Sequence, residues 1–329
     1  MPLGCVTILL NPSGDPLSGA LDSAWLSATL AAFGFASSSM DDRVFTQVAL
    51  SRARRAIDHF VARHAHAVAA ESDGVVALLE GWARSTGGST AVRFEPSFGD
   101  AWRCAAADAI DPERAAITAA SLALHLSACG VEGDWEIALR SARRLRCGSL
   151  LLPGAHRLSV RSGPAVVSVT TSAADGRRVC RLPLSGEFAR SGGAVWYASI
   201  LPRVEVGRAS IRLLTRPALE SSMDPGGESS KVFEQARESI DSRQIDCVRT
   251  ALELIAAQAP AYLPWVSRAI HDLILLNVSG PSIDSGSVEN APGLIYLAAR
   301  DDAGWIAARL VHESARQHVN LLNTLGPTG

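Results

Sequence analysis

The sequence lacks a concentration of basic charge. Of its 329 residues, 31 are Lys or Arg and 33 are Asp or Glu, which gives a formal net charge of −2. Proteins that grip nucleic acid neutralise its phosphates with clustered basic side chains. We therefore expect no nucleic-acid partner.

Long apolar runs are also missing. No segment approaches the roughly 20 apolar residues that a membrane-spanning helix needs. The first apolar run, residues 6–10, is shorter than the apolar core of a signal peptide, which has about 7–15 residues. We expect a cytoplasmic protein with no membrane partner.

Paired cysteines are absent as well. The six cysteines are far apart and form no Cys-x-x-Cys pair, which excludes an obvious zinc ribbon or redox pair. We expect them to be small buried side chains in a reducing compartment.

What the chain does contain is enough apolar residues, 47%, to build a large core, in two domains or in one large domain. The pattern predicts an α+β protein. We expect a mainly helical N-terminal region over 1–149, a β-rich region over 150–220, a polar linker over 221–230 and a helical C-terminal region over 231–329.

Hydrophobic periodicity supports this division. Helical three-and-four spacing is found over 24–33, 44–61 and 112–129, and a short apolar helix is expected over 74–82. Asp175-Gly176 is the strongest hairpin signal, because both residues tolerate the positive φ angles of a tight turn. Strands are expected around 158–160, 166–171, 178–184, 195–197 and 211–213.

The C-terminal region has its own pattern. Helical spacing covers 232–274, a strand is expected over 292–298, and Asp301-Asp302 can cap a final helix over 304–322. On that helix His312 and Arg316 share a less apolar face. The opposite apolar stripe contains Ile306, Leu310, Ser314, Gln317 and Leu321.

His312-Glu313 is the strongest chemical signal in this helix. A second histidine four residues after the first would share its face and bind the same metal ion. Arg316 occupies that position, and a guanidinium has no lone pair to donate. His318 lies about 120° around and about 9 Å along the helix axis from His312, so the two cannot chelate one ion from an intact helix. We expect His318 to be packed or to lie at an edge.

The stretch from Ser285 to Leu322, with Pro-Gly-Leu-Ile-Tyr-Leu followed by Leu-Val-His-Glu-Ser-Ala-Arg-Gln-His-Val-Asn-Leu-Leu, resembles the HExxH-motif proteins of modified-peptide biosynthesis. The resemblance implies a peptide β-hydroxylase that uses Fe(II) and 2-oxoglutarate and acts on a ribosomally made precursor peptide. It also implies that His312 is a metal ligand and that Glu313 is the catalytic motif glutamate.

The remaining ligands can be sought by chemistry. A non-haem iron site needs two imidazoles and a carboxylate on one side. His271-Asp272 supplies one of each, Asp301-Asp302 precedes the motif helix, and His318 is a further candidate metal ligand. Arg316 can bind a carboxylate of 2-oxoglutarate through its forked donors. The ordinary alternatives are a helix-surface pair, a helix cap and a surface ion pair.

Three functions therefore stay open. The first is the metal- and 2-oxoglutarate-dependent peptide hydroxylase. The second is a non-catalytic member that binds the precursor peptide and has a degenerate metal site, which Arg316 favours. The third is a zinc peptidase, in which Glu313 would activate a metal-bound water.

Overall fold

The helical spacing of residues 44–61 forms part of one long helix, α2 (Ser39–Ala69), in the computed structural model of the chain. The helix expected over 24–33, the strand expected over 195–197 and the linker residues 221–228 lie outside the described part. The structure describes residues 39–85, 96–107, 109–147, 150–174, 176–183, 199–220, 229–277, 284–288, 291 and 293–323.

Three shorter helices follow α2. The helix α5 begins at Pro112, as predicted, because the Asp111 carboxylate accepts a hydrogen bond of 3.1 Å from the backbone N–H of Glu113 and so caps the first turn. Gly74 precedes α3 with φ of 75° and lies against the backbone of Asp134. The bounds are α3 (Val75–Arg84), α4 (Pro96–Ala106) and α5 (Pro112–Ala128).

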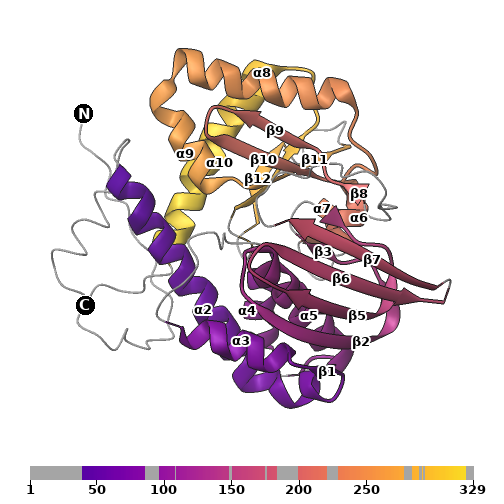
Figure 1. The fold of residues 1–329 in the computed structure, drawn as a ribbon. Coiled ribbons are helices and arrows are strands. Elements are labelled where there is room, and N and C mark those ends of the chain that lie inside the picture. The colour runs from indigo at the N-terminus through magenta and orange to yellow at the C-terminus, as the bar shows by residue number, and fades with distance from the viewer. Residues whose placement is uncertain are drawn as a thin grey trace, which may run out of the picture.

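An antiparallel sheet packs on these helices, with the strand order β1-β2-β5-β6-β7 (Figure 1). The predicted hairpin is present, and Ala173 pairs with Gly176 where its two strands meet. The strands are β1 (Ser72–Asp73), β2 (Gly133–Arg143), β5 (Ala155–Ser162), β6 (Val166–Ala173) and β7 (Gly176–Pro183).

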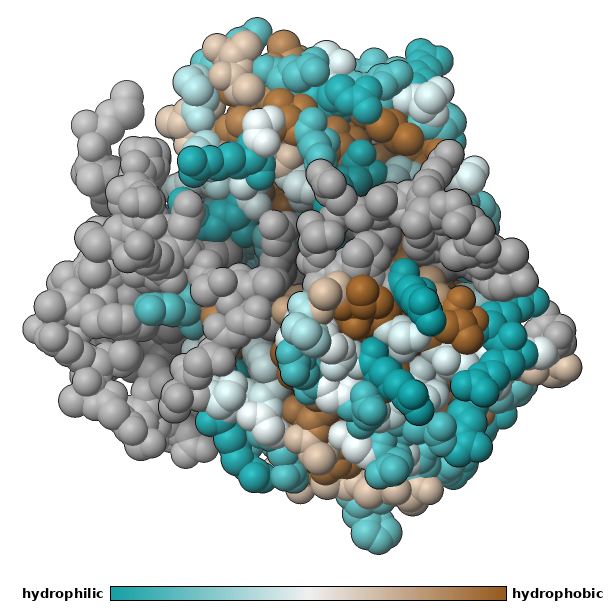
Figure 2. Space-filling model, viewed as in Figure 1, coloured by the Kyte–Doolittle hydropathy of each residue, from teal (hydrophilic) through white to brown (hydrophobic). Residues whose placement is uncertain are grey.

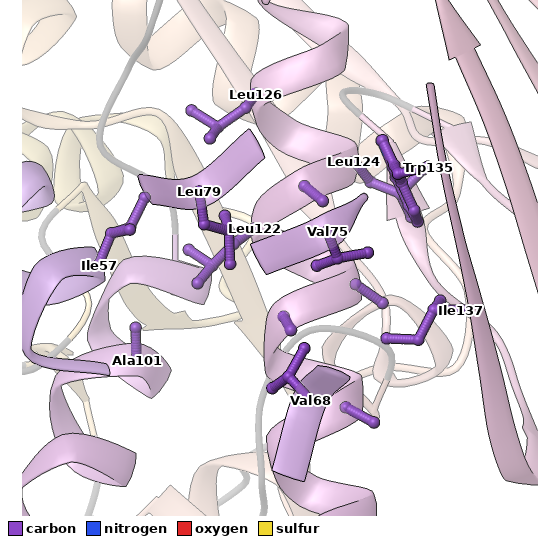
Figure 3. Close-up of a cluster of buried hydrophobic side chains, with 14 of the residues drawn as sticks. Ile57, Val68, Val75, Leu79, Ala101, Leu122, Leu124, Leu126, Trp135 and Ile137 are labelled. Carbon is purple, nitrogen blue, oxygen red and sulfur yellow. The ribbon is translucent and has the colours of Figure 1, made fainter. Parts of the chain in front are cut away.

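The first core lies between this sheet and the helices α2 to α5. Figure 3 shows Val75 and Leu79 of α3 beside Leu122 of α5, with Trp135 and Ile137 reaching the cluster from β2. All five side chains are buried. Their removal from water is the main force that holds the helices against the sheet.

The strand β2 lies inside the region expected to be mainly helical. Its buried residues Trp135, Ile137 and Leu139 alternate with more exposed ones, which is the period of a strand with one face on a core. The helix α4 was not anticipated from the sequence. Both β2 and α4 lie in the segment 1–149, where the predicted elements were those with the longest helical patterns.

A second sheet has the order β12-β13-β11-β10-β9, with β10, β11 and β13 parallel and the two outer strands antiparallel. Three helices cover one face of this sheet, as Figure 1 shows: α8 (Ser242–Gln258), α9 (Leu263–Ala269) and α10 (Ala303–Asn323). The strands are β9 (Arg203–Val206), β10 (Ala209–Leu214), β11 (Asp272–Leu276), β12 (Ser285–Ser287) and β13 (Leu294–Ala298).

The other face of the second sheet is also covered. Leu214, Ile274 and Leu294 of the sheet form a core with Leu219 and Phe233 from two short helices. These helices are α6 (Arg216–Glu220) and α7 (Ser229–Gln235). Strands buried on both faces have continuous apolar runs in place of alternation.

This double burial explains why β11 was not recognised. Leu273 and Ile274 were expected to continue a helix from Val266, but α9 ends at Ala269 and Asp272–Leu276 is a strand with every residue buried. The prediction was wrong here because a short apolar run fits a buried strand and a buried helix equally well.

The long helix α2 contributes side chains to the cores of both halves. Val48 of α2 packs in the core of the second sheet, whereas Ile57 and Phe60 of the same helix pack in the first core. A third, small sheet has the strand order β3-β4-β8. Its strands are β3 (Arg146–Cys147), β4 (Leu150–Leu151) and β8 (Ser199–Ile200), and a 3-10 turn η1 (Pro260–Tyr262) precedes α9.

The predicted α+β class is confirmed, with helices and sheets in both halves. Among the described residues, no helix is both long enough and apolar enough to cross a membrane. Cys104, Cys129, Cys180 and Cys247 are free thiols, and each is buried or half-buried.

Candidate functional site

The motif helix α10 begins where the sequence predicted. The Asp302 carboxylate accepts a hydrogen bond of 3.0 Å from the Trp305 N–H, which caps the helix. Asp301 instead forms an exposed ion pair of 2.8 Å with Arg243 of α8. The two aspartates therefore have the ordinary roles of cap and surface ion pair.

The predicted faces of α10 are also confirmed. Ile306, Leu310 and Gln317 are buried, whereas His312 and Arg316 are exposed. Leu321 belongs to the same stripe, but its side chain lies outside the described part. The first residue of the motif therefore faces solvent.

Glu313 is completely buried, at 0% exposure, although it follows an exposed histidine. Its Oε1 accepts a hydrogen bond of 2.9 Å from the Ser285 hydroxyl, and its Oε2 accepts one of 2.8 Å from the Ser287 hydroxyl. Arg316 Nη1 lies 3.6 Å from Oε2. Each carboxylate oxygen thus has its own hydroxyl donor, and the adjacent guanidinium supplies a compensating charge.

The strand β12 presents these hydroxyls because alternate residues of a strand face the same side. The intervening Gly286 pairs with Tyr296 of β13, and a Cβ on Gly286 would collide with the Tyr296 hydroxyl group. Glycine is therefore required by the close approach of the tyrosine ring. The Ser-Gly-Ser spacing is the sequence signal for this contact, because it places two hydroxyls on one face of a strand, but it does not identify Glu313 as their acceptor.

Gln317 attaches the same helix to the neighbouring strand. Its Oε1 accepts a hydrogen bond of 3.1 Å from the Gly293 N–H, and its Nε2 donates one of 3.3 Å to the Leu294 carbonyl. The side chain is 1% exposed. Together Glu313 and Gln317 hold α10 to the β12–β13 end of the sheet.

His318 is packed, as the helical wheel predicted. It is 2% exposed, its Nδ1 lies 2.7 Å from the Ser314 carbonyl oxygen, and its ring stacks on Trp265 at a centroid distance of 4.7 Å. Burial lowers the pKa of His318 to about 4; the Ser314 hydrogen bond opposes the shift and the Arg268 charge adds to it. The imidazole is therefore neutral at pH 7.

The Asp272 carboxylate accepts hydrogen bonds from two arginines. Arg212 donates to it through Nε at 2.7 Å and through Nη2 at 3.2 Å, and Arg146 donates through Nη1 at 3.1 Å. The three side chains are at most 10% exposed. This carboxylate joins β3 of the N-terminal half to β10 and β11, and its neighbour His271 is half-buried at the start of β11.

The candidate metal ligands are therefore not brought together. His312 faces solvent, His318 stacks on Trp265, and the carboxylate next to His271 is bound by guanidinium groups. No group of three or more His, Cys, Asp or Glu side chains in the described part could hold a metal ion. The donor set does not fit the iron site that the motif resemblance implies. The Arg316 guanidinium, which was predicted to bind a carboxylate of 2-oxoglutarate, lies beside the Glu313 carboxylate.

Comparisons of the chain with protein families, with curated proteins and with solved structures find no match.

Proposed function

We propose that the chain binds a ribosomally made precursor peptide without metal chemistry, as a non-catalytic relative of the HExxH peptide-modification proteins. The inference that the ligand is a precursor peptide rests on the sequence resemblance. The observation that supports a non-catalytic role is the buried Glu313 carboxylate, whose two oxygens are already bonded to Ser285 and Ser287.

The charge arrangement supports the same proposal. In an HExxH helix the residue four positions after the first histidine supplies a second metal ligand. Here Arg316 occupies that position, and its guanidinium lies beside the motif glutamate. The Arg316 side chain is exposed, but its guanidinium lies 3.6 Å from the buried Glu313 Oε2, and its positive charge disfavours a divalent cation at this carboxylate. In this proposal Arg316 takes over the role of the cation.

The hydroxylase and the zinc peptidase are the competing hypotheses. Both need a metal ion held on the His312 face with at least one further imidazole or carboxylate. Either would require Glu313 to leave two hydrogen bonds and a buried position. Loss of these contacts with a buried carboxylate costs about 3 kcal/mol or more.

Metal content separates these hypotheses. We expect purified wild-type chain and His312→Ala to contain equally little iron and zinc by elemental analysis. The variant Arg316→His is the matched positive control, because it places two imidazoles one turn apart on an exposed helix face and should take up Zn²⁺. About one metal per wild-type chain that disappears in His312→Ala would contradict the proposal.

Peptide binding is measured separately. A synthetic peptide that corresponds to a short reading frame beside the gene should bind the wild-type chain in calorimetry, equally well with and without EDTA. Mass spectrometry should recover the peptide unchanged after incubation with Fe(II), 2-oxoglutarate and oxygen. A mass increase of one oxygen would support the hydroxylase, cleavage without 2-oxoglutarate would support the peptidase, and absence of binding would reject the peptide-binding role.

A further inference from the structure

The strand β7 forms one edge of the first sheet. In the described part of the chain it pairs with β6 alone, from Val166↔Pro183 to Ala173↔Gly176. The backbone N–H and C=O groups on its other side are those that an added strand pairs with. Figure 1 shows β7 as a long arrow along the border of the sheet.

The side chains of β7 alternate between the core and solvent. Cys180 is paired with Val169 and packs against the first core. Arg177, Val179 and Arg181 therefore project from the opposite face, and all three are exposed, with Val179 at 50%. The solvent-facing side of β7 therefore presents one apolar side chain between two basic ones.

Neither Arg177 nor Arg181 forms an ion pair with any described side chain. Their cross-strand neighbours are Ser172 and Ser168, which carry no charge. By contrast, Arg157 of β5 is already paired with Glu136 of β2. Figure 2 views the molecule from the side that shows this sheet, where hydrophilic side chains surround smaller apolar patches. Among the described side chains, the positive charges of Arg177 and Arg181 are therefore not compensated.

We propose that β7 binds an extended acidic peptide as an additional strand of the sheet. Residues directly opposite each other in paired strands share a face. The occupant should therefore have the pattern acidic-x-apolar-x-acidic, with the apolar residue against Val179 and the acidic residues near Arg177 and Arg181. This inference deepens the proposed function, on which it rests, by naming the surface and the class of peptide.

A second copy of the chain is a poorer occupant. If two β7 strands paired antiparallel about Val179, Arg177 of each would lie opposite Arg181 of the other. Like charges directly opposite each other destabilise strand pairing. An acidic peptide places carboxylates opposite Arg177 and Arg181, so no like charges face each other.

Two fluorescein-labelled peptides of equal composition test the pattern by fluorescence anisotropy. In Ser-Asp-Thr-Val-Thr-Asp-Ser the acidic residues share a face with valine, whereas in Ser-Thr-Asp-Val-Asp-Thr-Ser they lie on the other face. We expect the first peptide to bind the full chain about three- to tenfold more tightly than the second, and its affinity should fall as the salt concentration is raised. Equal affinity, or no binding of either peptide, would overturn the proposal.

Two variants locate the binding site. Arg177→Gln with Arg181→Gln should weaken binding of the first peptide about three- to tenfold, because each exposed ion pair contributes modestly. Arg157→Gln removes one charge from the same sheet and should leave binding unchanged. All three substitutions are on exposed side chains, so thermal melts should coincide with that of the wild type. An equal loss in Arg157→Gln would show non-specific attraction and overturn the site.

Backbone pairing is tested on the peptide itself. N-methylation of alternate residues removes the N–H groups along one side of the extended peptide, and two peptides cover the two sides. We expect one of them to lose binding and the other to keep it. Retention by both would exclude strand pairing, and loss by both would place the peptide between two partners instead of at an edge.

The two proposals fail differently. If the designed peptide binds but the peptide encoded beside the gene does not, the β7 site stands and the precursor role fails. If the encoded peptide binds equally well to the Arg177→Gln/Arg181→Gln variant, the role stands and the β7 site fails. Dimers of the free chain that dissociate when Val179 is replaced by glutamate, which would then lie opposite itself across the paired strands, would assign the edge to self-association and overturn the site.

Discussion

Ser287 and Glu313 lie 26 positions apart in the sequence, and the Ser287 hydroxyl donates a hydrogen bond of 2.8 Å to Glu313 Oε2. With Ser285 on the other oxygen, this contact fixes the motif helix to the short edge strand β12. In the proposed function, a motif glutamate held in this way has a structural role.

Replacing Glu313 by alanine should destabilise the fold. The substitution leaves two buried hydroxyls without an acceptor and opens a cavity, and we expect the free energy of unfolding to fall by about 3 kcal/mol in urea denaturation. Glu313→Gln keeps an acceptor and should cost about 1 kcal/mol. The exposed His312→Ala is the control and should stay within about 0.5 kcal/mol of the wild type. Wild-type stability in Glu313→Ala would contradict a structural role.

Acid should weaken the fold through His318. The folded-state pKa of about 4 lies below the ordinary value of 6.5, so the native state disfavours the proton. The stabilisation is complete above pH 6.5 and is lost as the pH falls from 6.5 to 4, by about 2 kcal/mol between pH 7 and pH 5. His318→Phe keeps a ring against Trp265 but cannot titrate.

The measurement is the free energy of unfolding at both pH values for the wild type and for His318→Phe. The decline between pH 7 and pH 5 should be about 2 kcal/mol smaller in the variant. Equal declines in the two proteins would show that protonation of this imidazole does not oppose folding.

Removing the Asp272 carboxylate should be more damaging than removing one of its arginines. Asp272→Ala leaves Arg146 and Arg212 as buried cations, and we expect a loss of about 4 kcal/mol in the free energy of unfolding. Arg146→Met keeps the two hydrogen bonds from Arg212 and fills part of the space. Its cost should be clearly smaller. The reverse order would show that the charge balance of this group is not what stabilises it.

Gly286→Ala should disturb the pairing of β12 with β13. The added Cβ would collide with the Tyr296 hydroxyl, so the ring or the strand must move, at a cost of about 2 kcal/mol. The same substitution in a Tyr296→Leu background should cost less, because the obstructing hydroxyl is gone. A double-mutant cycle by urea denaturation measures this coupling. Additive costs would place the strain elsewhere.

Much of the fold could be predicted from local patterns. The hairpin of β6 and β7, the start of α5 at Pro112 and the two faces of α10 follow from residues close together in the sequence. The strand β11 did not, because burial on both faces removes the alternation that identifies a strand. The helix pattern of 1–149 likewise concealed β2, whose buried residues show a period of two only over a short segment.

The candidate site shows the same division more sharply. The sequence by itself determined that His312 and Arg316 share the less apolar face of the helix and that Arg316 cannot ligate a metal, because both follow from helix geometry and side-chain chemistry. Only the tertiary structure decided that Glu313 accepts hydrogen bonds from Ser285 and Ser287 and that Asp272 forms ion pairs with two arginines. These partners lie between 26 and 126 positions away, and their meeting depends on how the sheets and helices pack.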